Sequence, residues 1–199
     1  EKAYAESVDI FLFFNDPAPT DIYTLSVQDA LEFGNFYSHQ KIAGDAEKAY
    51  VESVDIYRKL ADKNPEIFLS GLAEHMVDLG RFYDNIERLN NAEKTYREAL
   101  DIYLKLLPEV PETAAENLDE IGEFFLYIDS KNAEKSFLKA LNLYRGLAEQ
   151  NSKVYNIDVA SILIQLESIY IVNGRLEDAK KAHLEASNIS QTLKGQYLE

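Results

Sequence analysis

The residues of this chain with the clearest chemical pattern are acidic, and they lie between Lys105 and Lys131. This stretch contains seven Asp and Glu residues and no basic residue. Four of the carboxylates recur at steps of three and four residues, which places them on one helix face, in a stripe about 60° wide at about 100° per residue. They are Glu112, Glu116, Asp119 and Glu123. Like charges at this spacing destabilise a helix by roughly 0.2–0.5 kcal/mol per pair, so the stripe has a cost.

Three interpretations of this acidic stripe stay open. A run of charge on a helix is most often a solvated face. The second interpretation is a docking strip for a basic segment of a partner, because opposite charge steers association. The third is a divalent metal site, although hard cations need several converging oxygens and one helix face seldom supplies them. We expect no metal and no cofactor, and we take the docking strip as the functional hypothesis.

The sequence offers little for catalysis. It has no Cys, which excludes a thiolate nucleophile and a Cys-ligated metal. It has no phosphate-binding loop, no G-x-S-x-G elbow and no HExxH pair. The three histidines, His39, His75 and His183, fall in different predicted helices without paired spacing. Since nothing assembles a nucleophile, a base and an oxyanion site, we expect no enzymatic activity.

The charge balance narrows the range of partners. Lys and Arg number 20 against 35 Asp and Glu, a net charge of -15. Nucleic acid and anionic membranes would be repelled, so we expect neither as a partner. We also expect no apolar run of the about 20 residues that a membrane helix needs. We expect a cytoplasmic protein, and an array that continues upstream of Glu1.

A repeated block sets the positions of the helices that carry these residues. The segments 1–10 and 47–56 are identical in nine of ten positions, EKAYAESVDI and EKAYVESVDI. Related segments begin at 92, 133 and 179, and the spacings between the leading alanines are 46, 41 and 46 residues. These alanines are Ala46, Ala92, Ala133 and Ala179. A period of this length is typical of a repeat protein built from helix pairs.

Each block follows a second motif with a small residue in it. The clearest example is Leu79-Gly80-x-x-Tyr83, followed by Ala92-x-x-x-Tyr96-x-x-Ala99. Small residues let two helices approach closely, while the aromatic rings fill the space beside the contact. The other copies of the first motif are Phe33-Gly34-x-x-Tyr37, Ile121-Gly122-x-x-Phe125 and Leu166-Glu167-x-x-Tyr170. In the last copy a glutamate replaces the small residue.

This pair of motifs resembles the tetratricopeptide repeat (TPR) family, and the resemblance extends over essentially the whole chain. The period is longer than the about 34 residues usual in that family, as in kinesin light chains and many prokaryotic TPR arrays. The resemblance implies an all-α fold, a right-handed superhelical solenoid of antiparallel helix hairpins. It also implies a protein-binding function.

The 3.6-residue periodicity and the breaks at Pro, Gly and Asn predict about nine helices and no strand. They are 1–14, 20–38, 45–62, 66–85, 91–107, 112–128, 132–149, 154–173 and 177–194. The first is an orphan second helix, and the others form the pairs 20–62, 66–107, 112–149 and 154–194. We expect one continuous array over residues 1–199.

In the TPR resemblance, one row of positions on each first helix faces a concave groove. We expect this groove to bind a protein or peptide. The part of that partner that lies against the acidic stripe should be basic. The candidate site residues are Asn35, Arg81, Asp84, Glu116, Asp119 and Glu123. One alternative is a ligand- or peptide-responsive regulatory domain of a signalling or transcription regulator. Another is self-association through the apolar face of the N-terminal helix.

Overall fold

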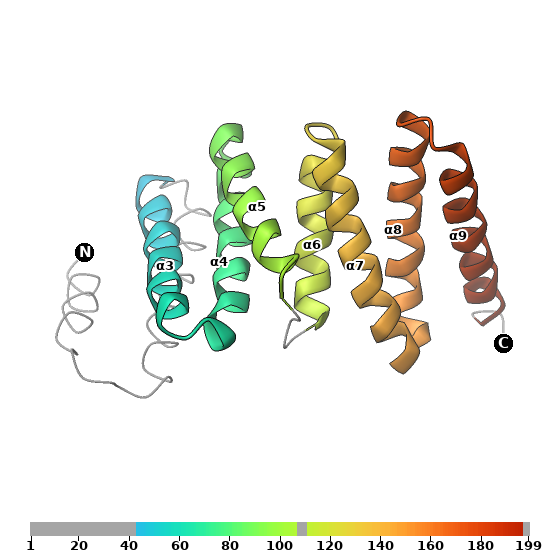
Figure 1. Ribbon diagram of the computed structural model, residues 1–199, viewed down its shortest axis with the longest axis horizontal. Helices are drawn as coiled ribbons and strands as arrows, with labels where there is room; N and C mark the ends of the chain where they lie inside the picture. The colour runs from blue at the N-terminus through green and yellow to red at the C-terminus, as the bar shows by residue number, and fades with distance from the viewer. Residues whose placement is uncertain (1–42, 107–110, 197–199) are drawn as a thin grey trace. The chain divides into compact units, whose positions relative to one another are not determined.

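A computed structural model describes residues 43–106 and 111–196, and these form seven α-helices and no strand (Figure 1). The helices are α3 (Ala43–Lys63), α4 (Pro65–Asn85), α5 (Leu89–Tyr103), α6 (Pro111–Phe125), α7 (Ser130–Gln150), α8 (Ser152–Val172) and α9 (Leu176–Gln196). The chain divides into two compact units, residues 1–92 and 93–199. The all-α prediction is confirmed for the described residues.

All seven described helices were expected, and two of them end early. The predicted helix 91–107 ends at Tyr103, and the predicted helix 112–128 ends at Phe125. In the second case the Leu126 and Ile128 N–H groups donate to carbonyls three residues back, at 3.2 and 3.1 Å, so the chain tightens into a turn instead of extending the α-helix. The predicted helices 1–14 and 20–38 lie outside the described residues. The single array and its superhelical arrangement stay predictions.

The first unit is held together by aromatic side chains between α3 and α4, which pack against each other. The rings of Tyr50 and Phe82 lie 5.1 Å apart between centroids, and both side chains are buried. A Cβ on Gly71 of α4 would overlap the Tyr57 ring of α3. Glycine at this position therefore lets the two helices approach, although Gly71 is not one of the small residues of the repeat motif.

In the second unit, α6 packs on α7, α7 on α8, and α8 on α9. The predicted small-residue contact is present between α6 and α7. A Cβ on Gly122 would lie 2.5 Å from a ring carbon of Phe137, whose side chain is fully buried. Phe137 stands four residues after Ala133, the aromatic position of the repeat. The motif therefore has a direct steric cause here.

The last pair, α8 and α9, uses a polar contact at the equivalent place. Glu167 replaces the glycine, and His183 replaces the aromatic residue. The His183 Nδ1 and a Glu167 carboxylate oxygen lie 3.2 Å apart. The small side chains of α9 remain buried, so α9 still packs closely on α8. They are Ala179, Ala182 and Ala186.

Ion pairs tie the turns to the preceding repeat. Arg88, in the turn before α5, pairs with Glu47 of α3 at 2.6 Å. Arg175, in the turn before α9, pairs with Glu134 of α7 at 2.5 Å. Both arginines stand four residues before a leading alanine, and both glutamates stand one residue after one. The contact therefore follows the repeat in both units.

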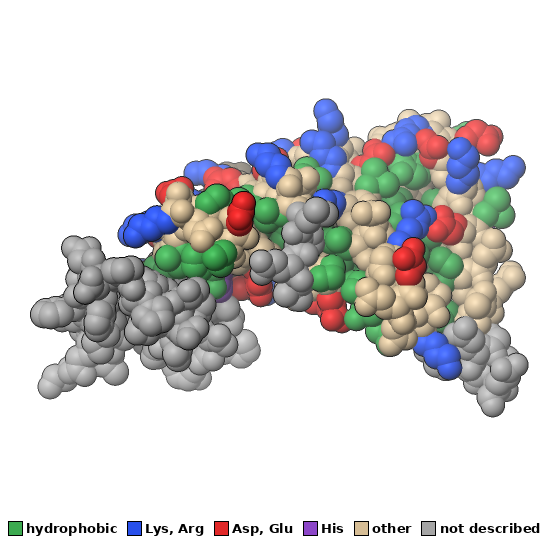
Figure 2. All heavy atoms as spheres, turned by 60° about the horizontal axis from the view of Figure 1, so that its bottom comes forward, with side chains coloured by type: hydrophobic (Ala, Val, Ile, Leu, Met, Phe, Trp, Pro, Cys, Tyr) green, Lys and Arg blue, Asp and Glu red, His purple; other side chains and the backbone are tan. Residues whose placement is uncertain are grey.

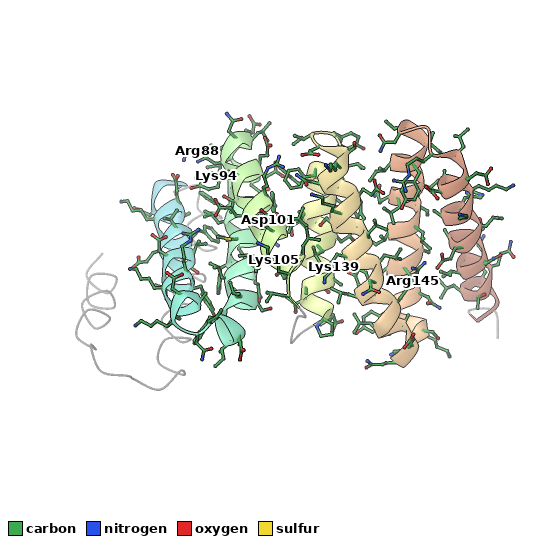
Figure 3. All side chains as sticks on the ribbon, in the orientation of Figure 1. Arg88, Lys94, Asp101, Lys105, Lys139 and Arg145 are labelled. Carbon is green, nitrogen blue, oxygen red and sulfur yellow. The ribbon has the colours of Figure 1, made fainter. Side chains whose placement is uncertain are left out.

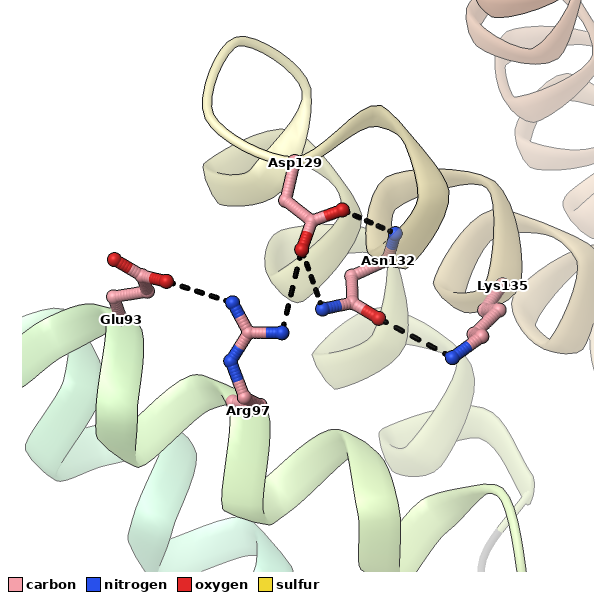
Figure 4. A network of polar contacts seen from close by, with 5 residues as sticks. All are labelled: Glu93, Arg97, Asp129, Asn132 and Lys135. Carbon is pink, nitrogen blue, oxygen red and sulfur yellow. Dashed lines mark hydrogen bonds and ion pairs between the residues drawn. The ribbon is translucent and has the colours of Figure 1, made fainter.

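The turn before α7 has the opposite polarity. Asp129 occupies the arginine position, caps α7 by accepting from the Asn132 N–H at 3.2 Å, and pairs with Arg97 of α5 at 3.3 Å (Figure 4). Glu93 holds the same guanidinium at 2.7 Å. The guanidinium also lies 5.3 Å from the centre of the Phe125 ring. This network fixes the turn at one end of α6.

Candidate functional site

The acidic stripe lies on one face of α6, as predicted. Glu112, Glu116 and Glu123 are exposed, while Asp119 is half-buried between them. The helix spans Pro111–Phe125 and contains no Lys or Arg. Its N-terminal proline and first-turn glutamate suit the positive end of the helix dipole, which offsets part of the repulsion.

Two residues of α8, which the sequence analysis did not identify, extend this acidic surface. The Tyr155 hydroxyl donates to a carboxylate oxygen of Glu112 at 2.9 Å. Burial raises the pKa of Asp158, and the charge of Glu112 raises it further. The carboxylates of α6 and the Asp158 carboxylate of α8 therefore share one surface of the second unit. Asp158 was missed because it lies one residue away from the repeat-equivalent position Ile157.

Asp119 is the most perturbed carboxyl group of this surface. Burial raises its pKa to about 7, and the charges of Glu123 and Asp158 add to the increase. The neighbouring hydroxyl of Tyr144 on α7 also has a raised pKa, because of burial and then the charges of Asp158 and Asp119. Near neutral pH the Asp119 carboxyl is therefore partly protonated, and the charge of the surface changes in this range.

The carboxylates of this surface are spread along the helices rather than gathered at a point. Within residues 43–106 and 111–196, no group of three or more His, Asp or Glu side chains is arranged to hold a metal ion. A hard cation needs several oxygens at one centre. The arrangement suits an elongated partner that carries several positive charges better than a single ion.

Beside the carboxylates, α8 exposes a row of apolar and small side chains. The three isoleucines Ile157, Ile164 and Ile171 are 62%, 52% and 52% exposed. Figure 2 shows hydrophobic side chains exposed among charged ones on the part of the surface formed by the C-terminal helices. We call the following residues the α8 row: Val154, Ile157, Ser161, Ile164, Ser168 and Ile171.

The apolar character of α8 corrects one expectation from the sequence. Ser152–Val172 has the length and composition that a membrane-crossing helix requires, whereas no such run was expected. A buried core helix meets the same criteria. Here α8 packs on α7 and α9 and also carries Asp158 and Glu167. Its apolar residues serve two faces, one in the core and one exposed.

The remaining candidate residues lie elsewhere. Arg81 and Asp84 are exposed on α4 of the first unit, and the Arg81 guanidinium pairs with Asp78 of its own helix at 2.8 Å. Asn35 and His39 lie outside the described residues. The structure thus brings Glu116, Asp119 and Glu123 together on α6, and one groove shared with α4 stays a prediction.

The basic side chains of the second unit lie on helices and turns other than α6. Figure 3 labels Lys139 and Arg145 on α7. The Lys139 ammonium donates to the Leu106 carbonyl at 3.2 Å, and Arg145 pairs with Glu185 of α9 at 2.6 Å. These two cations are held by contacts within the unit, whereas α6 contributes only negative charge.

Comparisons with known proteins agree with this fold. Residues 74–105, which cover the second half of α4 and α5, match the family model described as a tetratricopeptide repeat. This match confirms the motif read from the same stretch of sequence. The likeness to kinesin light chains in particular stays a prediction. No curated protein sequence compared with the chain matches it.

Three solved structures are similar to the chain at low identity. BtubC (BKLC) from P. vanneervenii has a TM-score of 0.63 and 18% identity, covering 92% of this chain and 68% of that one. MamA has a TM-score of 0.44 and 18% identity, covering 78% and 73%. The structure titled DHF58 filament has a TM-score of 0.47 and 20% identity, covering 87% and 94%. At these identities the likeness concerns the fold, and it rests on BtubC.

Proposed function

The chain contains a tetratricopeptide repeat, and from that premise we propose that it is a non-enzymatic scaffold or sensor module that binds a protein or peptide segment. The binding residues would be those of the first helix in each pair. In the second unit these are Glu116, Asp119 and Glu123 of α6. In the first unit they are Arg81 and Asp84 of α4, with Asn35 from the preceding pair. We also propose a cytoplasmic location.

The observation that carries this proposal is the shared acidic surface of α6 and α8. A solvated helix face needs no contribution from a second helix. Here Tyr155 and Asp158 of α8 converge with the α6 carboxylates, although burial, with the charges of Glu123 and Asp158 added to it, raises the pKa of Asp119 to about 7. Groups that oppose folding are often retained for binding. A basic segment would neutralise several of these charges at once.

A peptide-display selection tests this function. The full chain is offered a random peptide library at low and moderate salt, beside a Glu116→Lys/Glu123→Lys variant. The control is Glu149→Lys/Glu177→Lys, which makes the same change in charge at two exposed positions on α7 and α9. We expect peptides rich in Lys and Arg to be enriched on the native chain and on the control, and lost on the α6 variant.

Two results would count against the proposal. If the native chain enriches no peptide, it is not a peptide-binding module. If the three proteins enrich the same peptides, the α6 carboxylates do not form the binding surface.

A further inference from the structure

We propose that the partner segment is a helix, packed lengthwise on the α8 row, with aliphatic side chains on the isoleucines and Lys or Arg side chains against the carboxylates of α6 and Asp158. This inference rests on the proposed function and adds the conformation and chemistry of the partner. The residues that carry it all lie in the second unit.

The spacing of the α8 row argues for a helical partner. Its members follow one another at steps of three, four, three, four and three residues. This alternation is the 3.5-residue repeat by which one α-helix packs along another. An extended peptide presents alternate side chains at a period of two and does not match it. Val154 and Ile171 are 17 residues apart in sequence, or about 26 Å at 1.5 Å per residue, which is the length of about five turns of a partner helix.

The side chains of the row alternate in size in a way that suits interlocking. Ile157, Ile164 and Ile171 are separated by seven residues each, and Ser161 and Ser168 lie between them. Large and small residues along a helix provide knobs and the holes that receive them. The Ser168 hydroxyl already donates to the Ile164 carbonyl of its own helix at 3.1 Å. Covering Ser168 therefore leaves no unpaired donor.

The charges that border the row select the partner's composition. Asp158 lies about 90° around α8 from the centre of the row, at about 100° per residue. Tyr155, which bonds to Glu112 of α6, lies about 60° farther around the helix in the same direction. A helix seated on the row would have one flank towards Asp158, whose charge acts on Asp119 of α6. Lys and Arg on that flank are long enough to reach carboxylates while their stems cover apolar surface.

Other occupants fit less well. A second copy that used the same row would bring two sets of carboxylates together, on a chain whose net charge is -15. A lipid surface with anionic head groups would meet the same repulsion. The favoured occupant is therefore a cationic amphipathic helix from another protein.

Titration calorimetry with a designed peptide tests this inference. The probe carries Leu at a 3–4 spacing and Lys and Arg on one flank of that row. A scrambled peptide of the same composition lacks the spacing, and a third peptide has Glu in place of each cation. On the full chain, the Ile164→Ser/Ile171→Ser variant is compared with Leu184→Ser on α9, since Leu184 and Ile164 are both 52% exposed.

We expect one probe to bind per chain, and we expect the scrambled and acidic peptides to bind at least roughly tenfold more weakly. Loss of the two isoleucines should weaken binding by roughly tenfold, because each contributes about half of its side-chain area to the contact. Leu184→Ser should change affinity by less than about twofold. Sedimentation of the chain alone tests whether a second copy occupies the row. If it does, the apparent molecular mass would rise with protein concentration, and the Ile164→Ser/Ile171→Ser variant would have a lower apparent mass than the native chain.

The inference is overturned if the scrambled peptide binds equally well, if the isoleucine variant keeps full affinity, or if the row mediates self-association. In each case the proposed function survives when the display library still yields peptides that need Glu116 and Glu123. If the library yields none, both fail.

Discussion

Replacing Gly122 with alanine tests the steric origin of the repeat motif. The added Cβ would lie 2.5, 2.7 and 2.8 Å from three ring carbons of Phe137. The ring is fully buried, so it has little room to move. Overpacking of this kind costs about 1–3 kcal/mol. Alanine in place of glycine inside a helix returns about 1 kcal/mol, and the net effect is a loss of roughly 0–2 kcal/mol.

Gly146 of α7 supplies the matched control. It also lies inside a helix, but a Cβ there would meet nothing within 4 Å. Gly146→Ala should therefore stabilise the chain by up to about 1 kcal/mol. The difference between the two variants isolates the clash, which we expect to be about 1–3 kcal/mol in the free energy of unfolding.

Urea unfolding followed by circular dichroism measures the two variants and a rescue. Phe137→Leu removes the ring that meets the new Cβ. In the Gly122→Ala/Phe137→Leu chain the two changes should therefore cost less together than separately, by at least about 1 kcal/mol. If Gly122→Ala is as stabilising as Gly146→Ala, or if the two costs simply add, the close approach of α6 and α7 is not what requires glycine.

Three further predictions concern single residues. Glu87, in the turn after α4, has a φ of 59°, and Gly174, in the equivalent turn after α8, has a φ of 72°. Because glycine adopts a positive φ without strain, Glu87→Gly should stabilise the chain by about 1 kcal/mol in urea unfolding. Gly174→Ala should destabilise it by about the same amount. A destabilising Glu87→Gly would contradict this. Because the pKa of Asp119 is raised to about 7 by burial, the folded chain holds this proton more tightly than the unfolded chain, and stability falls as pH rises from about 4 to 7. Asp119→Asn should therefore stabilise at pH about 8 and lose this gain towards pH about 4, and a gain independent of pH would refute the shift. Burial lowers the pKa of His75 to about 4, so stability should fall as pH drops from about 6.5 to 4. Thermal unfolding of His75→Phe should show less of that loss, and an unchanged pH profile would exclude His75 as the cause.

Much of the fold could be predicted because its determinants are local. Gly122 and Phe137 occupy repeat positions that can be identified in the sequence. The periodicity predicts most ends of the described helices to within a few residues. The early end of α6 was missed, because Asp129 both caps α7 and pairs with Arg97. That choice between continuing one helix and starting the next depends on a contact with a third helix.

The candidate site was predicted in part, for a similar reason. One helix face follows from spacing alone, so Glu116, Asp119 and Glu123 were found. Tyr155 and Asp158 were missed, because their relation to Glu112 depends on how α8 is rotated against α6. A repeat alignment gives equivalent positions, and Asp158 lies one residue off that row. The rotation is set by packing of buried side chains, which the sequence does not display.

The most direct test of the binding account is an amide NMR titration of the full chain with a peptide recovered from the display library. The account predicts that shifts concentrate in α6 and on the exposed side of α8, around Glu116, Asp119, Ile157 and Ile164. Glu116→Lys/Glu123→Lys should remove them. Shifts confined to α7 and α9, or spread evenly over the second unit, would contradict the assignment of the α6 and α8 surface as the partner-binding face.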